Sequence, residues 1–202
     1  MQVDCEAIVC AVLTHGEHGA IVRLLTPEHG MAAGYVRGGR GRRLRPILIP
    51  GNLVAVQLRW RTEAQLPQAS IELVHSRAPI LAEPLPSAAI EWATALVASA
   101  LPERQPYPRL YQALSGLLDA VEAAPSASGW GGALAGFETL VVSDLGYGSD
   151  EPASSDLFKA LDASGGRLFS DVLGGRIDSL RDSRQRLVER LRRALVRPAG
   201  GP

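Results

Sequence analysis

The chain has 202 residues, enough for one large domain or two small ones, and its formal net charge at neutral pH is zero. Hydrophobic residues make up 46% and charged residues 21%, which excludes a wholly disordered chain. An apolar stretch of about 18 residues, as a membrane span requires, is absent, and the first residues lack the pattern of a secretory signal. We therefore expect a cytoplasmic protein that does not enter a membrane.

The first 80 residues have the pattern of short strands joined by turns. Apolar, β-branched stretches of strand length occur at 7–13, 20–25, 31–37, 53–61 and 70–75. Glycine-rich or proline-containing turns separate the first strands, with Pro27 and Gly30 in the second of these turns. Five short strands in this length indicate a small barrel, because closure removes exposed sheet edges.

From Pro86 onward the apolar residues follow a helical period. The pattern predicts helices over 88–101, 106–124, 133–145, 156–163 and 178–196, and one or two helical turns over 167–173. Ser155 is a candidate cap for the fourth helix, and Gly146 is a candidate stop for the third. The sequence thus predicts an α+β protein with an all-β domain over 1–80 and an all-α domain over 81–202.

The arginines of the β region are concentrated where acidic residues are absent. Seven arginines and no acidic residue lie between Glu28 and Glu63, which creates a local positive field. The seven are Arg37, Arg40, Arg42, Arg43, Arg45, Arg59 and Arg61. The first five occur among glycines, so we expect them on a flexible loop beside the barrel.

An arginine can bind a phosphate through two parallel hydrogen bonds, and single-strand binding grooves combine such charges with a small barrel. We take the seven arginines as the candidate DNA-binding residues. The alternative is a solvated loop that only maintains solubility. Tyr35 and Trp60 lie near the cluster and either stack on bases or fill the barrel core. The arginine-rich face of the last helix either adds a second phosphate contact or is simply solvated.

Catalytic patterns are missing from the sequence. The histidines His15, His18, His29 and His75 do not follow a metal-binding motif, and there is no phosphate-binding loop or nucleophile elbow. Cys5 and Cys10, the only cysteines, are too few for a four-cysteine zinc site. We therefore expect a protein that is not an enzyme and that has no cofactor and no metal. A metal-dependent enzyme using the first three histidines remains a minor hypothesis.

Three segments in order along the chain resemble the RecO family of bacterial recombination mediators. Residues 25–30 contain Thr26 and Gly30 at the spacing of the family's T-x-x-x-G turn. Residues 36–43, Val-Arg-Gly-Gly-Arg-Gly-Arg-Arg, are similar to its x-K-G-A-R-x-x-[KR] segment. Residues 137–148, which end in Leu-Gly-Tyr-Gly, resemble the end of a family helix.

This resemblance implies an N-terminal OB-fold, a helical domain, and a role in DNA repair and recombination. It implies binding to single- and double-stranded DNA, annealing of complementary strands, and loading of RecA together with RecR on strands coated by single-strand binding protein. Contact with that protein would be made through its acidic C-terminal tail. Arg37, Arg40, Arg42 and Arg43 occupy positions where the family has DNA-contacting basic residues.

The sequence departs from the family in its C-terminal part. Many members carry a cysteine-containing insertion, sometimes zinc-binding, after the Leu-Gly-Tyr-Gly element, whereas here no cysteine follows Cys10. We therefore expect no zinc and a shortened helical domain. The alternative function is a non-catalytic adaptor, in which the barrel or the helices bind a protein and the arginine loop contacts an acidic partner.

Overall fold

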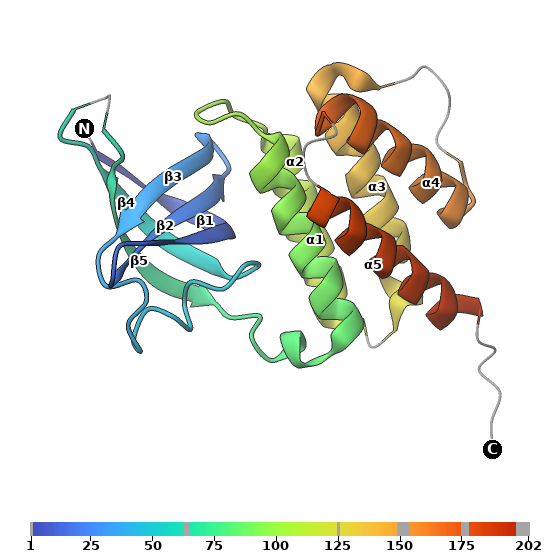
Figure 1. Ribbon diagram of the computed structural model, residues 1–202, viewed down its shortest axis with the longest axis horizontal. Helices are drawn as coiled ribbons and strands as arrows, with labels where there is room; N and C mark the ends of the chain where they lie inside the picture. Colours follow the sequence, from blue (N-terminus) through green and yellow to red (C-terminus); the bar gives the residue numbers. More distant parts are fainter. Residues whose placement is uncertain (1, 63–64, 125, 149–153, 175–177, 197–202) are drawn as a thin grey trace.

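The computed structural model describes residues 2–62, 65–124, 126–148, 154–174 and 178–196. The first part forms five strands, and the second part is helical (Figure 1). The strands are β1 (Gln2–His15), β2 (Gly19–Thr26), β3 (Gly30–Val36), β4 (Leu53–Arg59) and β5 (Gln68–His75). This arrangement confirms the predicted α+β class.

The five strands close into a barrel in the order β1-β2-β3-β5-β4. Strand β1 is long enough to pair with two neighbours: Gln2–Ile8 pairs with β4, and Ile8–His15 pairs with β2, with an irregularity between Val9 and Ala11. Closure depends on one parallel pair, Tyr35 with Gln68, so the sheet is mixed. The order and the closure are those of an OB-like barrel.

Alternate residues of each strand face the interior of the barrel, and small and branched side chains fill it. Ala7, Val9, Val22, Leu24 and Val54 are fully buried in it. The neighbouring residues in β1 point the other way because successive strand residues face opposite sides. Two of these, Ile8 and Cys10, belong to a second core cluster shared with the helices.

The helical part begins with a short 3-10 turn, Ile80–Ala82. The α-helices are α1 (Pro84–Ala100), α2 (Pro108–Ala123), α3 (Gly131–Val142), α4 (Leu157–Arg167) and α5 (Asp178–Val196). Prolines occupy the first turn of α1 and α2, where their missing N–H group costs no hydrogen bond. Within the described residues, no helix combines the length and the apolar composition needed to cross a membrane.

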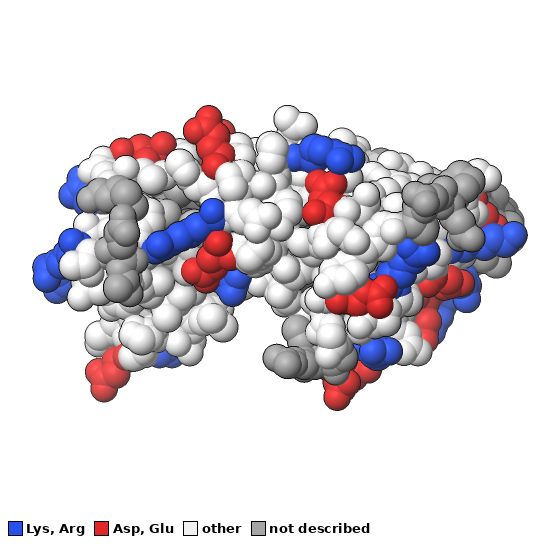
Figure 2. All heavy atoms as spheres, turned by 90° about the horizontal axis from the view of Figure 1, so that it is seen from above, with Lys and Arg blue, Asp and Glu red and all other residues white. Residues whose placement is uncertain are grey.

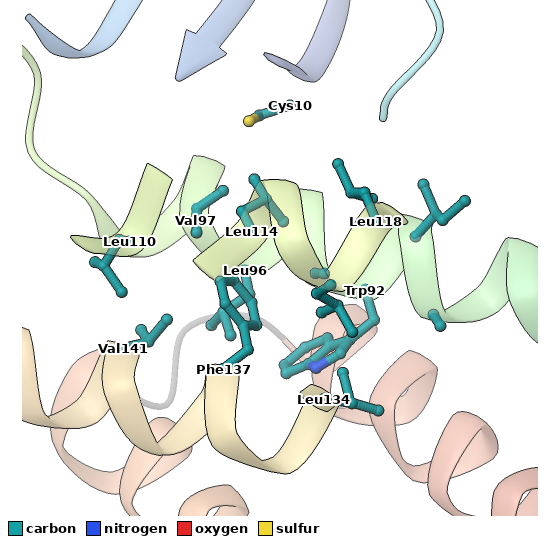
Figure 3. Close-up of a cluster of buried hydrophobic side chains, with 14 of the residues drawn as sticks. Cys10, Trp92, Leu96, Val97, Leu110, Leu114, Leu118, Leu134, Phe137 and Val141 are labelled. Atoms are coloured by element: carbon teal, nitrogen blue, oxygen red, sulfur yellow. The ribbon is translucent and has the colours of Figure 1, made fainter. Parts of the chain in front are cut away.

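The helices form two layers behind the barrel. Helices α1 and α2 lie next to the strands, and α3, α4 and α5 lie on the far side (Figure 1). Figure 3 shows Cys10 between the strands and the layer of α1 and α2, and Phe137 of α3 approaching that layer from the opposite side. Trp92, which is 1% exposed, is among the largest side chains buried between the layers.

A buried carboxylate on α3 joins this helix to α1, α4 and α5. Glu138 of α3 is fully buried and accepts hydrogen bonds from the Trp92 indole (2.8 Å) and the Ser164 hydroxyl (2.6 Å). Arg184 of α5 donates to both carboxylate oxygens, through Nε at 2.8 Å and a terminal nitrogen at 2.7 Å. Gly165 lies against this guanidinium, where a Cβ would be 2.2 Å from its nitrogen.

The barrel and α2 are joined by ion pairs around Arg77, which is 4% exposed. Its guanidinium donates to the Gly51 carbonyl (2.7 Å) and pairs with Asp119 and Glu122 of α2. His75 at the end of β5 contacts the same Glu122 at 2.8 Å. These hydrogen bonds and ion pairs hold the last strand against the second helix.

Several predicted boundaries need correction. Helix α4 is capped by Asp156, not Ser155: its carboxylate accepts hydrogen bonds from the backbone N–H groups of Phe158 (2.9 Å) and Lys159 (3.1 Å). Strand β1 extends beyond both ends of the predicted stretch because each of its halves finds a partner strand. Gly146 adopts a left-handed φ of +88° within the π-helical turn Ser143–Tyr147 that follows α3, as expected of a helix stop. The division into 1–80 and 81–202 remains a prediction.

Candidate nucleic-acid interface

Residues 37–48, which we call the basic loop, follow β3 and are tightly folded. Gly38 has a φ of +70°, and the Gly41 N–H donates to the Gly38 carbonyl at 2.8 Å. The Arg45 N–H donates to the Gly41 carbonyl at 3.0 Å. Leu48 ends the loop with its side chain buried in the barrel core. The predicted flexible loop is therefore an ordered one.

A buried asparagine holds the end of the basic loop. The Asn52 side-chain amide donates to the carbonyls of Pro46 (3.2 Å) and Ile47 (3.1 Å). Its own carbonyl oxygen accepts the backbone N–H of Arg77 at 2.9 Å. The loop is thereby connected, through one side chain, to the segment that leads into the helices.

The arginines of the basic loop differ in their surroundings. Arg37, Arg42, Arg43 and Arg45 are exposed, and none forms an ion pair with an acidic residue of the described segments. Arg40 is also exposed, but it donates to the carbonyls of the β1–β2 hairpin at residues 16 (3.4 Å) and 17 (3.0 Å). Four guanidinium groups are thus available to an external anion, and the fifth anchors the loop.

Arg59 and Arg61 lie elsewhere on the barrel. Arg59 is the last residue of β4, opposite Gln2 and Gln68, and Arg61 follows it in the β4–β5 connection. Figure 1 places the end of β4 at the upper edge of the barrel and the basic loop at its lower edge. The structure therefore brings the first five predicted arginines together and separates these two from them.

The charge of Arg59 is partly balanced by Asp4. The pKa of the Asp4 carboxyl lies below its ordinary value because Gln2 and Gln57 donate hydrogen bonds to it and because Arg59 is nearby. On the face seen in Figure 2, basic side chains alternate with acidic ones, without a continuous basic surface. The basic loop is the stronger candidate for phosphate binding.

The two aromatic candidates have different environments. Trp60 packs against the barrel core, and its indole nitrogen is buried and has no hydrogen-bond partner among the residues that the structure describes. Tyr35 is half-buried and contacts His15 edge-on, with ring centroids 5.6 Å apart. Gly19 permits this contact, because a Cβ there would lie 2.5 Å from the Tyr35 ring. Trp60 thus serves the core, and Tyr35 lies beside the β1–β2 hairpin.

The histidines are dispersed over the barrel. His15 and His18 flank the β1–β2 turn, and His29 lies in the next turn. Over the described segments, no three His, Cys, Asp or Glu side chains converge as ligands of a metal would. The minor hypothesis of a metal-dependent enzyme has no geometric support from these histidines.

The arginines of α5 are largely occupied. Arg181 lies over the Phe169 ring at 4.7 Å and Arg192 over the Phe158 ring at 4.9 Å. Arg193 is 3.7 Å from Glu189 on the same helix. Arg186 and Arg190 are exposed and have no acidic partner within the residues described. The helix has less free charge than its composition indicates.

Sequence reasoning missed the part that the end of β1 plays beside the basic loop. Val12 and Thr14 line a hollow that Arg40 and Arg45 border on its other side. Neither residue differs in the sequence from an ordinary strand residue, so no local pattern reveals this role. The hollow becomes visible only once the loop is folded back onto β1.

Comparison with known families agrees with this architecture in both halves. Residues 1–77 match the family described as recombination protein O N terminal, and residues 84–194 match recombination protein O C terminal. The chain belongs to the RecO family. Membership of this family agrees with the prediction of a protein that is not an enzyme.

Curated relatives named DNA repair protein RecO cover the same region. The relative from Gluconacetobacter diazotrophicus is 39% identical over 153 residues, which is 74% of this chain and 60% of the relative. Those from Phenylobacterium zucineum and Rhodospirillum centenum are each 40% identical over 151 residues, covering 74% of this chain and 61% and 59% of the relatives. The chain thus spans about three-fifths of the length of these relatives.

Proposed function

We propose that this protein is a DNA-binding recombination mediator in DNA repair, which holds single- and double-stranded DNA on the basic loop. The observation that carries the proposal is the ordered loop with four exposed arginines, which lack acidic partners in the described segments, beside an OB-like barrel. Family membership supports the same role. The function needs no bond-breaking group, cofactor or metal.

The proposed action is electrostatic. Two complementary strands repel each other through their phosphates, and guanidinium groups that bind both backbones lower this repulsion. The strands release condensed counterions when the arginines replace them, so binding weakens as salt is added. Annealing then follows from base pairing between strands that are held close together.

The proposal includes partners of the kind expected from the sequence. The protein would act in the cytoplasm with RecR on strands coated by single-strand binding protein. RecA would then be loaded onto these strands as an indirect partner. The acidic tail of single-strand binding protein has an apolar end, so it requires an apolar hollow with an arginine at its rim. Family membership supports these partners, and the contact surfaces are left to experiment.

Strand annealing tests the proposal directly. We expect the wild-type chain to accelerate annealing of complementary oligonucleotides, both naked and coated by single-strand binding protein. A variant with Arg42, Arg43 and Arg45 replaced by alanine should lose about tenfold of this acceleration, because three exposed charged contacts of about 0.5 kcal/mol each amount to about 1.5 kcal/mol. The measurement is the fluorescence quench of a labelled strand pair.

The matched control removes the same charge from the helical domain. A variant with Arg186, Arg190 and Arg193 replaced by alanine keeps the basic loop and should retain most of the annealing. Equal losses in the two variants would show that only total charge matters and would reject the loop as the site. Absence of DNA binding by the wild-type chain would favour the adaptor function instead.

A further inference from the structure

A groove of about 350 Å³ runs between the end of β1 and the basic loop. Val12, Ala20 and Leu48 supply apolar lining, and Thr14 lies on the β1 side. Arg40 and Arg45 border the groove on the loop side. An apolar depression bordered by two cations thus lies against the basic loop, and one of these cations, Arg45, is among the four free arginines.

One wall of the groove is an unpaired strand edge. On the side of β1 away from β2, pairing with β4 ends at Ile8. Val9 then exchanges backbone hydrogen bonds with Gly51 (2.8 Å) and Asn52 (3.0 Å). Beyond Val9, no strand of the described segments pairs with this edge, so its backbone groups are left for solvent or a ligand.

The groove is shaped before a ligand arrives. Gly39 allows the basic loop to approach β2 closely, since a Cβ there would lie 2.7 Å from the Ala20 Cβ. The Arg40 N–H donates to the His18 carbonyl at 3.2 Å, and its guanidinium bonds to the same hairpin. These contacts fix the charge of Arg40 at the rim, so binding does not require it to be ordered first.

We propose that this groove seats an unpaired nucleobase of single-stranded DNA, with the adjoining phosphates held by Arg40 and Arg45. The inference rests on the proposed function and adds the strand type and the place of the base. The apolar lining contacts the face of a base, and the arginines donate hydrogen bonds to the adjoining phosphates. In a duplex the bases are stacked and paired, so only the phosphates reach the protein.

The first test compares three probes of equal length at one salt concentration: oligothymidylate, an abasic strand with the same phosphates, and a blunt duplex. Fluorescence anisotropy gives the affinities. We expect oligothymidylate to bind about tenfold more tightly than the abasic strand, because a seated base buries apolar surface that the abasic strand lacks. Equal affinity of these two strands would overturn the inference while leaving the proposed function intact. Failure of all three to bind would reject the proposed function.

The second test locates the base. Thr14 is exposed on β1, and a Thr14→Cys variant places a small thiol in the groove; Ser179→Cys on α5 is the control. Maleimide labelling of the thiol introduced on β1 should slow about tenfold when oligothymidylate is present at ten times its dissociation constant, while the control rate stays unchanged. The slow labelling of Cys5 and Cys10 is subtracted using the wild-type chain.

Protection should depend on the base. The abasic strand and the duplex, at equal saturation, should protect the thiol of the Thr14→Cys variant much less than oligothymidylate does. Full labelling of this thiol while oligothymidylate is bound would overturn the inference and leave the free edge of β1 available to an extended peptide. Equal protection by all three probes would also overturn it, because phosphate contacts alone would then explain the footprint.

Discussion

Arginines have different roles in this protein, and the groups around each arginine determine its role. Arg42 and Arg43 are exposed and lack an acidic partner among the described residues, so they keep their charge for an external anion. Arg77 and Arg184 are buried, and both pair with carboxylates and donate to carbonyls. The sequence separates these groups only in part: the run without acids between 28 and 63 predicts the free ones, whereas nothing local marks the buried ones.

The Glu138 carboxylate should be essential for stability. Glu138→Ala leaves the Arg184 guanidinium buried without its partner, and we expect unfolding free energy to fall by about 3–5 kcal/mol. Urea unfolding measures the loss. Glu189→Ala, at an exposed pair on α5, is the control and should change stability by less than about 1 kcal/mol. Similar values for the two variants would contradict a buried network.

At the scale of elements, the spacing of apolar residues predicted the five strands and the main helices. This was possible because each strand and each helix buries one face against a hydrophobic core. Two features were not predictable this way. The order of the basic loop depends on Leu48 and on the Asn52 amide, which are distant from the glycines that suggested flexibility. The full length of β1 depends on having two partner strands.

A substitution in the β2–β3 turn should test whether the connection between α1 and α2 packs against the barrel. Gly30 has a φ of +68°, and a Cβ there would lie 1.8 Å from the Gln105 carbonyl oxygen. Gly38 has a φ of +70° but open space around it. We expect Gly38→Ala to cost about 1 kcal/mol from backbone strain, and Gly30→Ala to cost at least about 2 kcal/mol because the backbone contact must also open.

Chemical or thermal unfolding of the two glycine variants provides the comparison. Because the φ angles match, the difference between the two losses reports the contact with Gln105 rather than the turn itself. The backbone N–H of Arg104, which donates to the Met31 carbonyl at 3.0 Å, should exchange faster in Gly30→Ala. Equal destabilisation by both substitutions would mean that the connection does not pack there.

At the scale of the molecule, the barrel and the helices share one hydrophobic cluster. Ile8, Cys10 and Leu25 of the barrel pack with α1 and α2, and Arg77 adds ion pairs at the same junction (Figures 1 and 3). The apolar pattern predicted a strand over 7–13, which lies within β1. It did not predict that the outer face is covered by helices, because the pattern of one strand does not name the element that packs on it.

Cys10 reports on this junction. Burial raises the pKa of its thiol from 9.0 to about 12, although a backbone hydrogen bond at Leu25 and the charge of Arg23 act in the opposite direction. Because the pKa of Cys10 is higher in the folded chain than in the unfolded chain, the buried neutral thiol contributes to the stability of the fold. This contribution is complete below pH 9 and is lost as the pH rises toward 12. At pH 8 the folded chain should react with iodoacetamide at Cys10 at least about a thousandfold more slowly than the unfolded chain.

Mass spectrometry of the alkylated peptide measures that rate. Arg77→Ala removes the ion pairs to α2 and should speed the labelling of Cys10 by opening the junction more often. Cys5, which is half-buried on the barrel side, should show the same rate in both proteins. Rapid labelling of Cys10 in the folded wild-type chain would contradict the shared cluster.

The central claim is that the exposed arginines of the basic loop bind DNA backbones, and the salt dependence of binding tests it most directly. The slope of log affinity against log salt for single-stranded DNA should become shallower by about 2 when Arg42, Arg43 and Arg45 are all replaced by alanine, since three phosphate contacts each contribute about 0.7. Arg186, Arg190 and Arg193 replaced together should leave the slope nearly unchanged. An unaltered slope in the basic-loop variant would contradict the claim.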